Sequence, residues 1–249
     1  MGWGNMSENP RATIVCCYNN ERQYNVFTQS LEEQDEKVAL IGIDNTNKRF
    51  TSNAAAFNYA MKSVTTKYVI FSHQDIILTT SKIIRQFVDY LERIGENDIL
   101  GVAGAKNDDP FVLTNVRRTA DGPFAGSERV KGLISCDTLD ECFFGGYSKC
   151  FKQYQFDETI CNGWHLYAVD RCLDAKRRNN KVYVCDISLI HTSKGNIDQA
   201  YNRCFLRLSK KYCKDIQYIK TPCAYARTGL ILRNISFVKR WISIQLNRY

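Results

Sequence analysis

Long apolar runs are missing from this 249-residue sequence. No stretch approaches the roughly 18 to 20 apolar residues that a membrane-spanning helix requires. The first ten residues lack the basic and apolar regions of a secretory signal, and none of the eleven cysteines makes the CxxC spacing of zinc or redox sites. These absences predict reduced, mostly buried thiols and a cytoplasmic protein, on the inner, reducing side of the cell.

Acidic residues are scarce near the end of the chain. Residues 201–249 hold eleven Lys or Arg, among them Arg248, and one acidic residue, Asp215, so they carry much of the net charge of +8. Apolar residues recur there at helical spacing from Leu230 to Leu246. We predict a basic, helical C-terminal extension that either contacts a membrane surface or packs on the rest of the chain or on a second subunit. Nucleic acid is not expected as a partner, because the clusters at predicted strand ends are acidic and repel phosphate.

Strands and helices alternate through the first hundred residues. Four short, β-branched apolar runs predict strands, at 12–18, 38–43, 68–72 and 99–103. Three segments between them predict helices, at 23–34, 53–64 and 81–94. Residues 104–135 are polar and contain Gly, Pro and Asp clusters, which indicates a long excursion or hairpin; a helix at 165–178 and strands at 181–185 and 187–191 follow. The pattern predicts an α/β fold with an open, mostly parallel sheet flanked by helices.

Polar clusters follow three predicted strands: Asn19-Asn20-Glu21, Asp44-Asn45 and His73-Gln74-Asp75. Ligands collect at the carboxyl ends of parallel strands, so these clusters predict one shared site. Acidic and amide groups there can accept hydrogen bonds from a nucleotide, and a divalent metal can hold its diphosphate. Each cluster has a structural alternative, because Asp44 can cap a turn and Asp75 can cap a helix.

The stretch from Thr13 to Leu78 resembles the donor half of family 2 glycosyltransferases, through IVCCYNNE, IGIDN, AAAFNYA and YVIFSHQDIIL. Its HQD places the resemblance in the streptomycin-biosynthesis StrF-like branch, whose metal motif is HQD rather than DXD. Later segments, DECFFGGY, FDE, WHLYAVDRCLDAKRRNNKVYV and IHTSKG, resemble the acceptor half in the same order. The resemblance implies a GT-A (nucleotide-diphospho-sugar transferase) domain over 11–200, with a nucleotide-sugar-binding half at 11–103, an acceptor half at 104–200, and the extension at 201–249.

The resemblance also implies roles for single residues. Donor contacts fall on Tyr18, Asn20, Glu21, Asp44, Asn58 and His73. Asp75 and His191 would hold Mn²⁺ or Mg²⁺ at the diphosphate, although a buried, hydrogen-bonded role for His191 is an equal alternative. The family carries an acidic pair on the acceptor helix where this chain has Ala168, so the catalytic base is sought among Asp170, Asp140 and Glu141, with His165 as a further candidate. Asp170 has an alternative role as an ion-pair partner of Arg171 or Lys176.

Together these features imply a metal-dependent, inverting glycosyltransferase. It would move a sugar from a nucleoside-diphosphate sugar, with a UDP-sugar favoured, to a hydroxyl of a glycan or lipid-linked acceptor in surface polysaccharide synthesis, at the inner face of the membrane. The alternative is a non-catalytic nucleotide-sugar or glycan-binding module that keeps the fold but lost its base at Ala168.

Overall fold

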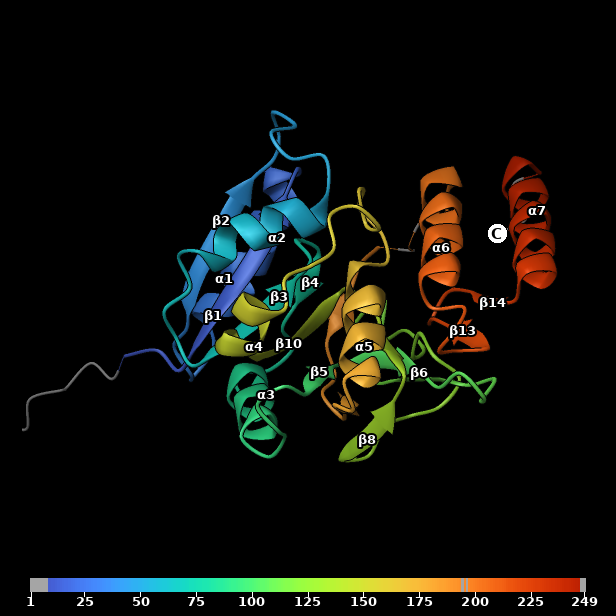
Figure 1. Cartoon of the computed structure of the whole chain (residues 1–249). Helices are drawn as coiled ribbons and strands as arrows, with labels where there is room; N and C mark the ends of the chain where they lie inside the picture. Colours follow the sequence, from blue (N-terminus) through green and yellow to red (C-terminus); the bar gives the residue numbers. More distant parts are fainter. Residues whose placement is uncertain (1–8, 194, 196, 247–249) are drawn as a thin grey trace, which may run out of the picture.

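A seven-stranded sheet forms the centre of the molecule (Figure 1). The computed structural model describes residues 9–193, 195 and 197–246, so Lys194 of the IHTSKG segment, Arg248 and most of the first ten residues lie outside the described residues. The strand order is β2-β1-β3-β10-β5-β11-β8. The bounds are β1 Ala12–Tyr18, β2 Ala39–Asp44, β3 Tyr68–Ser72, β5 Ile99–Gly101, β8 Leu133–Cys136, β10 Phe143–Tyr147 and β11 Val182–Cys185. Because β8 and β10 run against the other five, the sheet is mostly parallel, as predicted.

Helices cover both faces of this sheet. Alternate residues of β1 point to opposite faces, so Ile14 joins one hydrophobic cluster and Val15 the other. The first cluster is completed by α1 (Glu21–Glu32) and α3 (Ile83–Leu91), and the second by α2 (Asn53–Met61), α4 (Ser148–Gln153) and α5 (Tyr167–Arg177). The strands are therefore apolar on both faces, which explains their continuous hydrophobic runs in the sequence.

Two predicted strands differ from the observed ones. The run at 99–103 is divided between β5 and β6 (Ala103–Ala105), and β6 belongs to a separate sheet of order β7-β6-β9 with β7 (Val112–Thr114) and β9 (Thr138–Leu139). The antiparallel β6–β7 pair confirms the hairpin predicted after residue 104. The run at 187–191 is reduced to β12 (Ile190–His191). Ser188 does not join a strand pair, because its carbonyl oxygen accepts from the Thr79 hydroxyl and its own hydroxyl donates to the carbonyl oxygen of Asn115.

Gly145 allows β10 to lie antiparallel between β3 and β5. A Cβ atom at this position would lie 2.2 Å from the carbonyl oxygen of Val69, far inside van der Waals contact. Only glycine therefore fits where the two backbones approach, and the GG pair of the sequence marks that approach.

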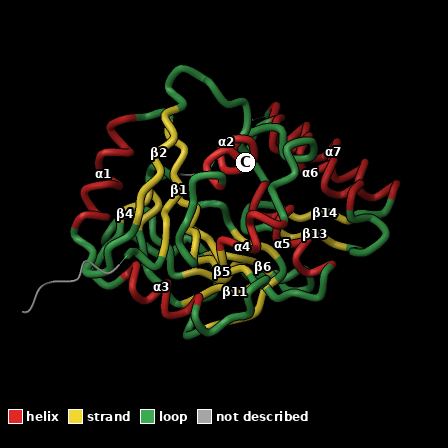
Figure 2. The backbone as a smooth tube through the Cα atoms, turned by 60° about the vertical axis from the view of Figure 1, so that its left-hand side comes forward, coloured by secondary structure: helices red, strands yellow, loops and turns green. Residues whose placement is uncertain are grey.

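The C-terminal segment forms α6 (Gln199–Lys211), the hairpin β13 (Tyr218–Lys220) and β14 (Tyr225–Arg227), and α7 (Leu230–Gln245). Figures 1 and 2 both place α7 beside α6, at the end of the molecule away from β2. Arg240 is 6% exposed and joins these parts: its Nε donates to Asn202 Oδ1 of α6 at 3.0 Å, and its Nη1 donates to the carbonyl oxygen of Tyr225 at 3.0 Å. The predicted helical extension is thus docked by a buried arginine.

The cysteines are all free, and eight of the eleven are buried, as predicted. Within the described residues, the helices are too short or too polar to cross a membrane.

Candidate functional site

Two short strands bring distant residues to the carboxyl edge of the sheet. After β3 the chain passes through His73, Gln74 and Asp75 into β4 (Ile76–Ile77), and β4 pairs antiparallel with β12 so that His191 lies opposite Ile76. Thr192 reinforces this ladder, because its backbone N–H donates to the carbonyl oxygen of Asp75 at 3.1 Å. A pairing across more than a hundred residues thereby places His191 beside the HQD segment.

Three side chains converge at this point. Asp75 Oδ1 lies 3.3 Å from His191 Nε2 and 3.9 Å from His73 Nδ1, and the two ring nitrogens lie 3.4 Å apart. The three ligand atoms all lie within 4.8 Å of one another, as a shared divalent ion requires. Two imidazoles and one carboxylate suit Mn²⁺ better than Mg²⁺, which prefers an all-oxygen octahedral shell. The donor set therefore fits a divalent transition metal such as Mn²⁺.

The charges of the three groups differ. Burial, followed by the proximity of His191, lowers the pKa of His73 to about 4, so its imidazole is neutral near pH 7. Burial is the largest influence on the pKa of both His191 and Asp75, but their mutual hydrogen bond and charge attraction, with smaller contributions from neighbouring charges, together outweigh it and raise the pKa of His191 and lower that of Asp75. These shifts favour the charged forms of Asp75 and His191 beside a neutral His73. Protonation of His191 would therefore compete with metal binding.

Tyr167 fixes the orientation of His73. Its hydroxyl lies 3.1 Å from His73 Nε2, and its ring, 1% exposed, is held in the core at the start of α5. Since Nδ1 faces Asp75, the tautomer that ligates a metal through Nδ1 carries its proton on Nε2 and donates it to the tyrosine oxygen. Sequence reasoning missed this residue, because its hydroxyl serves the site only through tertiary packing.

A cavity of about 210 Å³ opens at the ends of β1 and β3, beside the cluster. Its lining includes Tyr18, Asn45, His73, Asp75 and Trp164. The middle residue of HQD shapes this cavity: Gln74 Oε1 accepts hydrogen bonds from the backbone N–H groups of Asn19 and Asn20, both at 2.9 Å. The HQD segment thus holds the loop after β1 as well as one edge of the cavity.

The other predicted donor residues lie outside this lining. Asn20 caps α1 by accepting from the N–H of Gln23, and it borders a neighbouring cavity together with Asp75. Asp44 is exposed and accepts from the N–H and hydroxyl of Thr46, an Asx turn whose hydrogen bonds lower the pKa of Asp44. Glu21 is exposed in the first turn of α1.

Asn58 lies on α2, where its side chain ties the helix to the segment after α4. Its amide nitrogen donates to the carbonyl oxygen of Phe156 at 2.9 Å and to Glu158 Oε1 at 2.8 Å, while its Oδ1 accepts from the N–H of Phe156. Only 7% of Asn58 is exposed. The structure therefore gives Asn58 a structural role and does not bring it to the strand-end cavity.

A larger cavity, of about 730 Å³, lies on the other side of His191. Asp140, Arg118, Asp198 and Ile244 contribute to its lining, and Ile244 comes from α7. Asp140 and His191 offer ligand atoms within 4.8 Å, and Asp140 is held in place because its Oδ1 accepts from the N–H of Cys142 at 2.9 Å. The cluster of His73, Asp75 and His191 thus borders both cavities, and the Asp140 carboxylate belongs to a residue that lines the larger one.

Glu141 and His165 are two further base candidates, and both are partly buried. Glu141 Oε1 is buried and has no hydrogen-bond partner among the described residues, and burial followed by the charge of Asp140 raises the pKa of Glu141 well above its usual range. A raised pKa favours the protonated carboxyl, which cannot accept a proton. His165 Nε2 lies 3.4 Å from Asp198 Oδ1, and burial lowers the pKa of His165.

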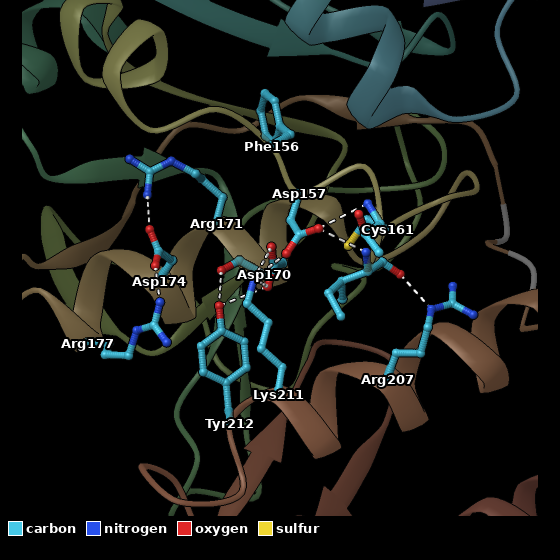
Figure 3. Close-up of polar contacts among 12 residues, drawn as sticks. Phe156, Asp157, Cys161, Asp170, Arg171, Asp174, Arg177, Arg207, Lys211 and Tyr212 are labelled. Atoms are coloured by element: carbon cyan, nitrogen blue, oxygen red, sulfur yellow. Dashed lines mark hydrogen bonds and ion pairs between the residues drawn. The ribbon is translucent and has the colours of Figure 1, made fainter.

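Asp170 lies in a different environment, on α5 (Figure 3). Lys211 Nζ of α6 lies 2.7 Å from Asp170 Oδ1 and 3.0 Å from Oδ2, and the Tyr212 hydroxyl donates to Oδ1 at 2.8 Å. Asp170 is 3% exposed and borders a separate cavity of about 350 Å³ that does not include the metal cluster. Its ion-pair partner is Lys211, and neither Arg171 nor Lys176 as the helix pattern suggested, because these pair with Asp174 and Asp137. Ala168, two residues earlier, is fully buried in the core.

Comparison with solved structures defines the fold as that of GT-A glycosyltransferases. PcManGT, a mannosyltransferase from Pyrobaculum calidifontis in complex with GDP-Man and Mn²⁺, superposes with a TM-score of 0.57 at 11% identity, over 97% of this chain and 72% of that one. S. aureus TarS 1–349 gives a TM-score of 0.53 at 12% identity, over 83% and 66%. GalNAc-T7 with UDP, GalNAc and Mn²⁺ gives 0.56 at 7% identity, over 82% and 48%.

Sequence comparison agrees with the fold. Residues 13–119 match a family model described as a glycosyltransferase-like family. A curated protein of Fuscovulum blasticum, named "ATP synthase subunits region ORF 6", is 28% identical over 156 residues, and the match spans 59% of this chain and 59% of that protein. The matched model and the fold together support a glycosyltransferase-like domain.

Proposed function

We propose that this protein is a metal-dependent, inverting glycosyltransferase of the HQD branch, which uses a nucleoside-diphosphate sugar, a UDP-sugar in the first instance. The observation that carries the proposal is the convergence of His73, Asp75 and His191 between the strand-end cavity and the larger cavity. Similar folds support it, because they were solved with UDP-GlcNAc, with UDP and Mn²⁺, or with GDP-Man and Mn²⁺.

The donor nucleotide belongs in the strand-end cavity. Tyr18 and Trp164 offer aromatic surface to a base there, and Asn45 and the loop held by Gln74 offer polar groups to the ribose. His73, Asp75 and His191 would hold the ion, which when bound offsets negative charge on the diphosphate. Tyr167 keeps His73 in the ligating tautomer.

The acceptor belongs in the larger cavity, and we assign the base to Asp140. An acceptor hydroxyl there attacks the anomeric carbon as its proton passes to Asp140; the new C–O bond forms while the bond to the diphosphate breaks, and the nucleotide leaves with the electron pair. This single displacement inverts the anomeric centre. Asp140 is preferred to Asp170 because it shares the cavity with His191, whereas Asp170 is engaged by Lys211.

The direct test is calorimetric titration of UDP, GDP and CDP with and without Mn²⁺ into the wild type and Asp75→Ala. We expect one nucleotide to bind in a manganese-dependent manner and Asp75→Ala to abolish that dependence. Asp89→Ala is the matched control, because its carboxylate lies on α3 and is 56% exposed. Failure of all three nucleotides to bind a folded, manganese-loaded wild type would refute the proposal.

A binding module without turnover is the second candidate, favoured by one observation: Ala168, at the position of the family's base, lies in the core with no exposed surface. Measurement of turnover distinguishes the two functions. An enzyme releases UDP from a UDP-sugar in the presence of an acceptor, and Asp140→Asn slows that release. A module binds UDP equally well but shows no release above the uncatalysed rate, with or without Asp140.

The acceptor we propose is a glycan or lipid-linked glycan of surface polysaccharide synthesis, reached at the inner face of a membrane through α7. Exposed apolar side chains recur along this helix and its C-cap at intervals of three or four residues; they are Ile231, Ile235, Val238, Ile242 and Leu246, and each is at least 44% exposed. Exposed apolar residues in a segment with eleven basic residues and one acidic residue are typical of a helix that lies on anionic lipid.

Vesicle sedimentation tests this assignment. We expect binding to phosphatidylglycerol vesicles that weakens with added salt and is lost in Ile231→Ser/Ile242→Ser. Val26→Ser/Leu40→Ser is the matched control, since these residues are 41% and 37% exposed at the opposite end of the chain. Equal loss in both variants, or self-association of the wild type in place of vesicle binding, would contradict a membrane role.

A further inference from the structure

One face of the β13–β14 hairpin forms a cavity that the proposed reaction does not use. The register pairs Tyr218 with Arg227, Ile219 with Ala226 and Lys220 with Tyr225. Ile219 and Ala226 are fully buried, and because side chains alternate along a strand, the other four share the opposite face. Together with residues 107–110 they enclose about 680 Å³.

Two tyrosines provide the aromatic surface of this cavity. The rings of Tyr218 and Tyr225 lie nearly parallel, with centroids 5.8 Å apart and an interplanar angle of 20°. Arg227 extends the same layer, with its guanidinium carbon 5.4 Å from the Tyr218 ring centre. Tyr225 is 47% exposed although its backbone is fixed by Arg240, so the hairpin presents a rigid, accessible ring. A flat aromatic face of this kind packs against the C–H face of a sugar ring.

Lys220 holds the opposite wall in position. It is 9% exposed; its backbone N–H donates to Asn107 Oδ1 at 2.9 Å, and its ammonium group donates to the carbonyl oxygens of Asp109 and Phe111. The ammonium group of Lys220 is therefore bonded to the backbone. Asp108 and Asp109 also line the cavity, and one carboxylate oxygen of Asp109 accepts from the N–H of Phe111 at 2.8 Å. Carboxylates accept hydrogen bonds from sugar hydroxyls, and the two aspartates balance the charges of Lys220 and Arg227, which suits an uncharged ligand.

The hairpin cavity and the larger cavity of the candidate site are lined by residues that are neighbours in the chain. Residues 107–110 and 220 border the one, whereas Val112 and Pro222 border the other. Pro110 and Val112, and likewise Lys220 and Pro222, are two residues apart. Two residues of extended chain span at most about 7 Å, so the linings of the two cavities come close to each other at these points and a chain molecule in the larger cavity can extend toward the hairpin. We propose that this face is a second subsite for an uncharged stretch of the acceptor glycan, several sugar units from the reacting hydroxyl. This inference rests on the proposed function only in identifying the bound glycan as the acceptor.

The test is calorimetric titration of chitohexaose and of maltohexaose into the full chain without nucleotide. At least one hexasaccharide should bind, Tyr225→Ala should weaken that binding about tenfold, and Tyr225→Phe should retain it within about twofold. Tyr59→Ala is the matched control, because Tyr59 has the same exposed fraction as Tyr225, 47%, but lies on α2.

Binding of UDP is measured on the same samples. Tyr225→Ala should leave it unchanged, since the hairpin lies outside the strand-end cavity. If UDP fails to bind while hexasaccharide binding still depends on Tyr225, the nucleotide-sugar function fails and the glycan subsite stands. If neither hexasaccharide binds, or if Tyr59→Ala weakens binding as much as Tyr225→Ala, the subsite is refuted.

Discussion

The ion pair between Asp170 and Lys211 can be used to test whether Asp170 has a structural or a catalytic role. Lys211→Met removes the cation that lies 2.7 Å from Asp170 Oδ1 and leaves this 3% exposed carboxyl with the Tyr212 hydroxyl (Figure 3). Loss of one partner from a buried ion pair costs about 3 to 5 kcal/mol. Because the Lys211 side chain is 20% exposed, we expect the lower end, about 3 kcal/mol. In a chain of this length that lowers the Tm by about 6 to 12 °C.

Asp170→Asn should cost less than Lys211→Met. It leaves the ammonium group of Lys211 with Asp157 Oδ2 at 2.9 Å and with solvent, so the remaining charge is still compensated. We expect about 1 to 3 kcal/mol, the cost of a lost hydrogen bond to a charged group. In the double variant no buried, uncompensated carboxylate remains, so its loss of stability should be smaller than the sum of the two single losses.

Urea unfolding of the four proteins measures these differences, and UDP release measured per folded molecule gives the catalytic readout. Arg85→Met is the stability control, because the Arg85–Asp35 pair at 3.3 Å has side chains 52% and 30% exposed and should contribute no more than about 1 kcal/mol. Release by Asp170→Asn should stay within about threefold of the wild type, since loss of a general base costs about a hundredfold or more. A variant with wild-type stability and a hundredfold slower release would refute the reasoning and return Asp170 to the catalytic site.

Three further predictions concern the site itself. Asp140→Asn should keep manganese-dependent UDP binding and slow release about a hundredfold or more; unchanged release would exclude Asp140 as the base. Tyr167→Phe removes the hydroxyl 3.1 Å from His73 Nε2 and should weaken Mn²⁺ binding about tenfold in a titration, with the fold retained. Glu141 has a raised pKa, so the folded state binds a proton that the unfolded state releases above about pH 4.3, and stability falls as pH rises from there. Glu141→Gln should therefore gain stability relative to the wild type between pH 5 and pH 8 in urea unfolding, and an equal difference at both pH values would contradict the burial of its carboxyl.

The sequence by itself determined the layered architecture. Strands such as Tyr68–Ser72 are apolar throughout because helices cover both faces of the sheet, and that pattern is visible without coordinates. It also determined that polar residues follow the strands, and hence where a ligand edge must lie. The division of 99–103 between two sheets escaped this reasoning, because an apolar run does not reveal where a strand bends away.

Only the tertiary structure decided which of those polar residues act together. Asp44 and Asp75 follow strands in the same manner, yet Asp44 closes a turn with Thr46 while Asp75 meets His191 across the β4–β12 pair. The sequence offered both Asp170 and Asp140 as bases, and they differ because Lys211 of α6 pairs with Asp170 and not with Asp140. These outcomes depend on partners that lie far away in the chain, and the local sequence does not record them.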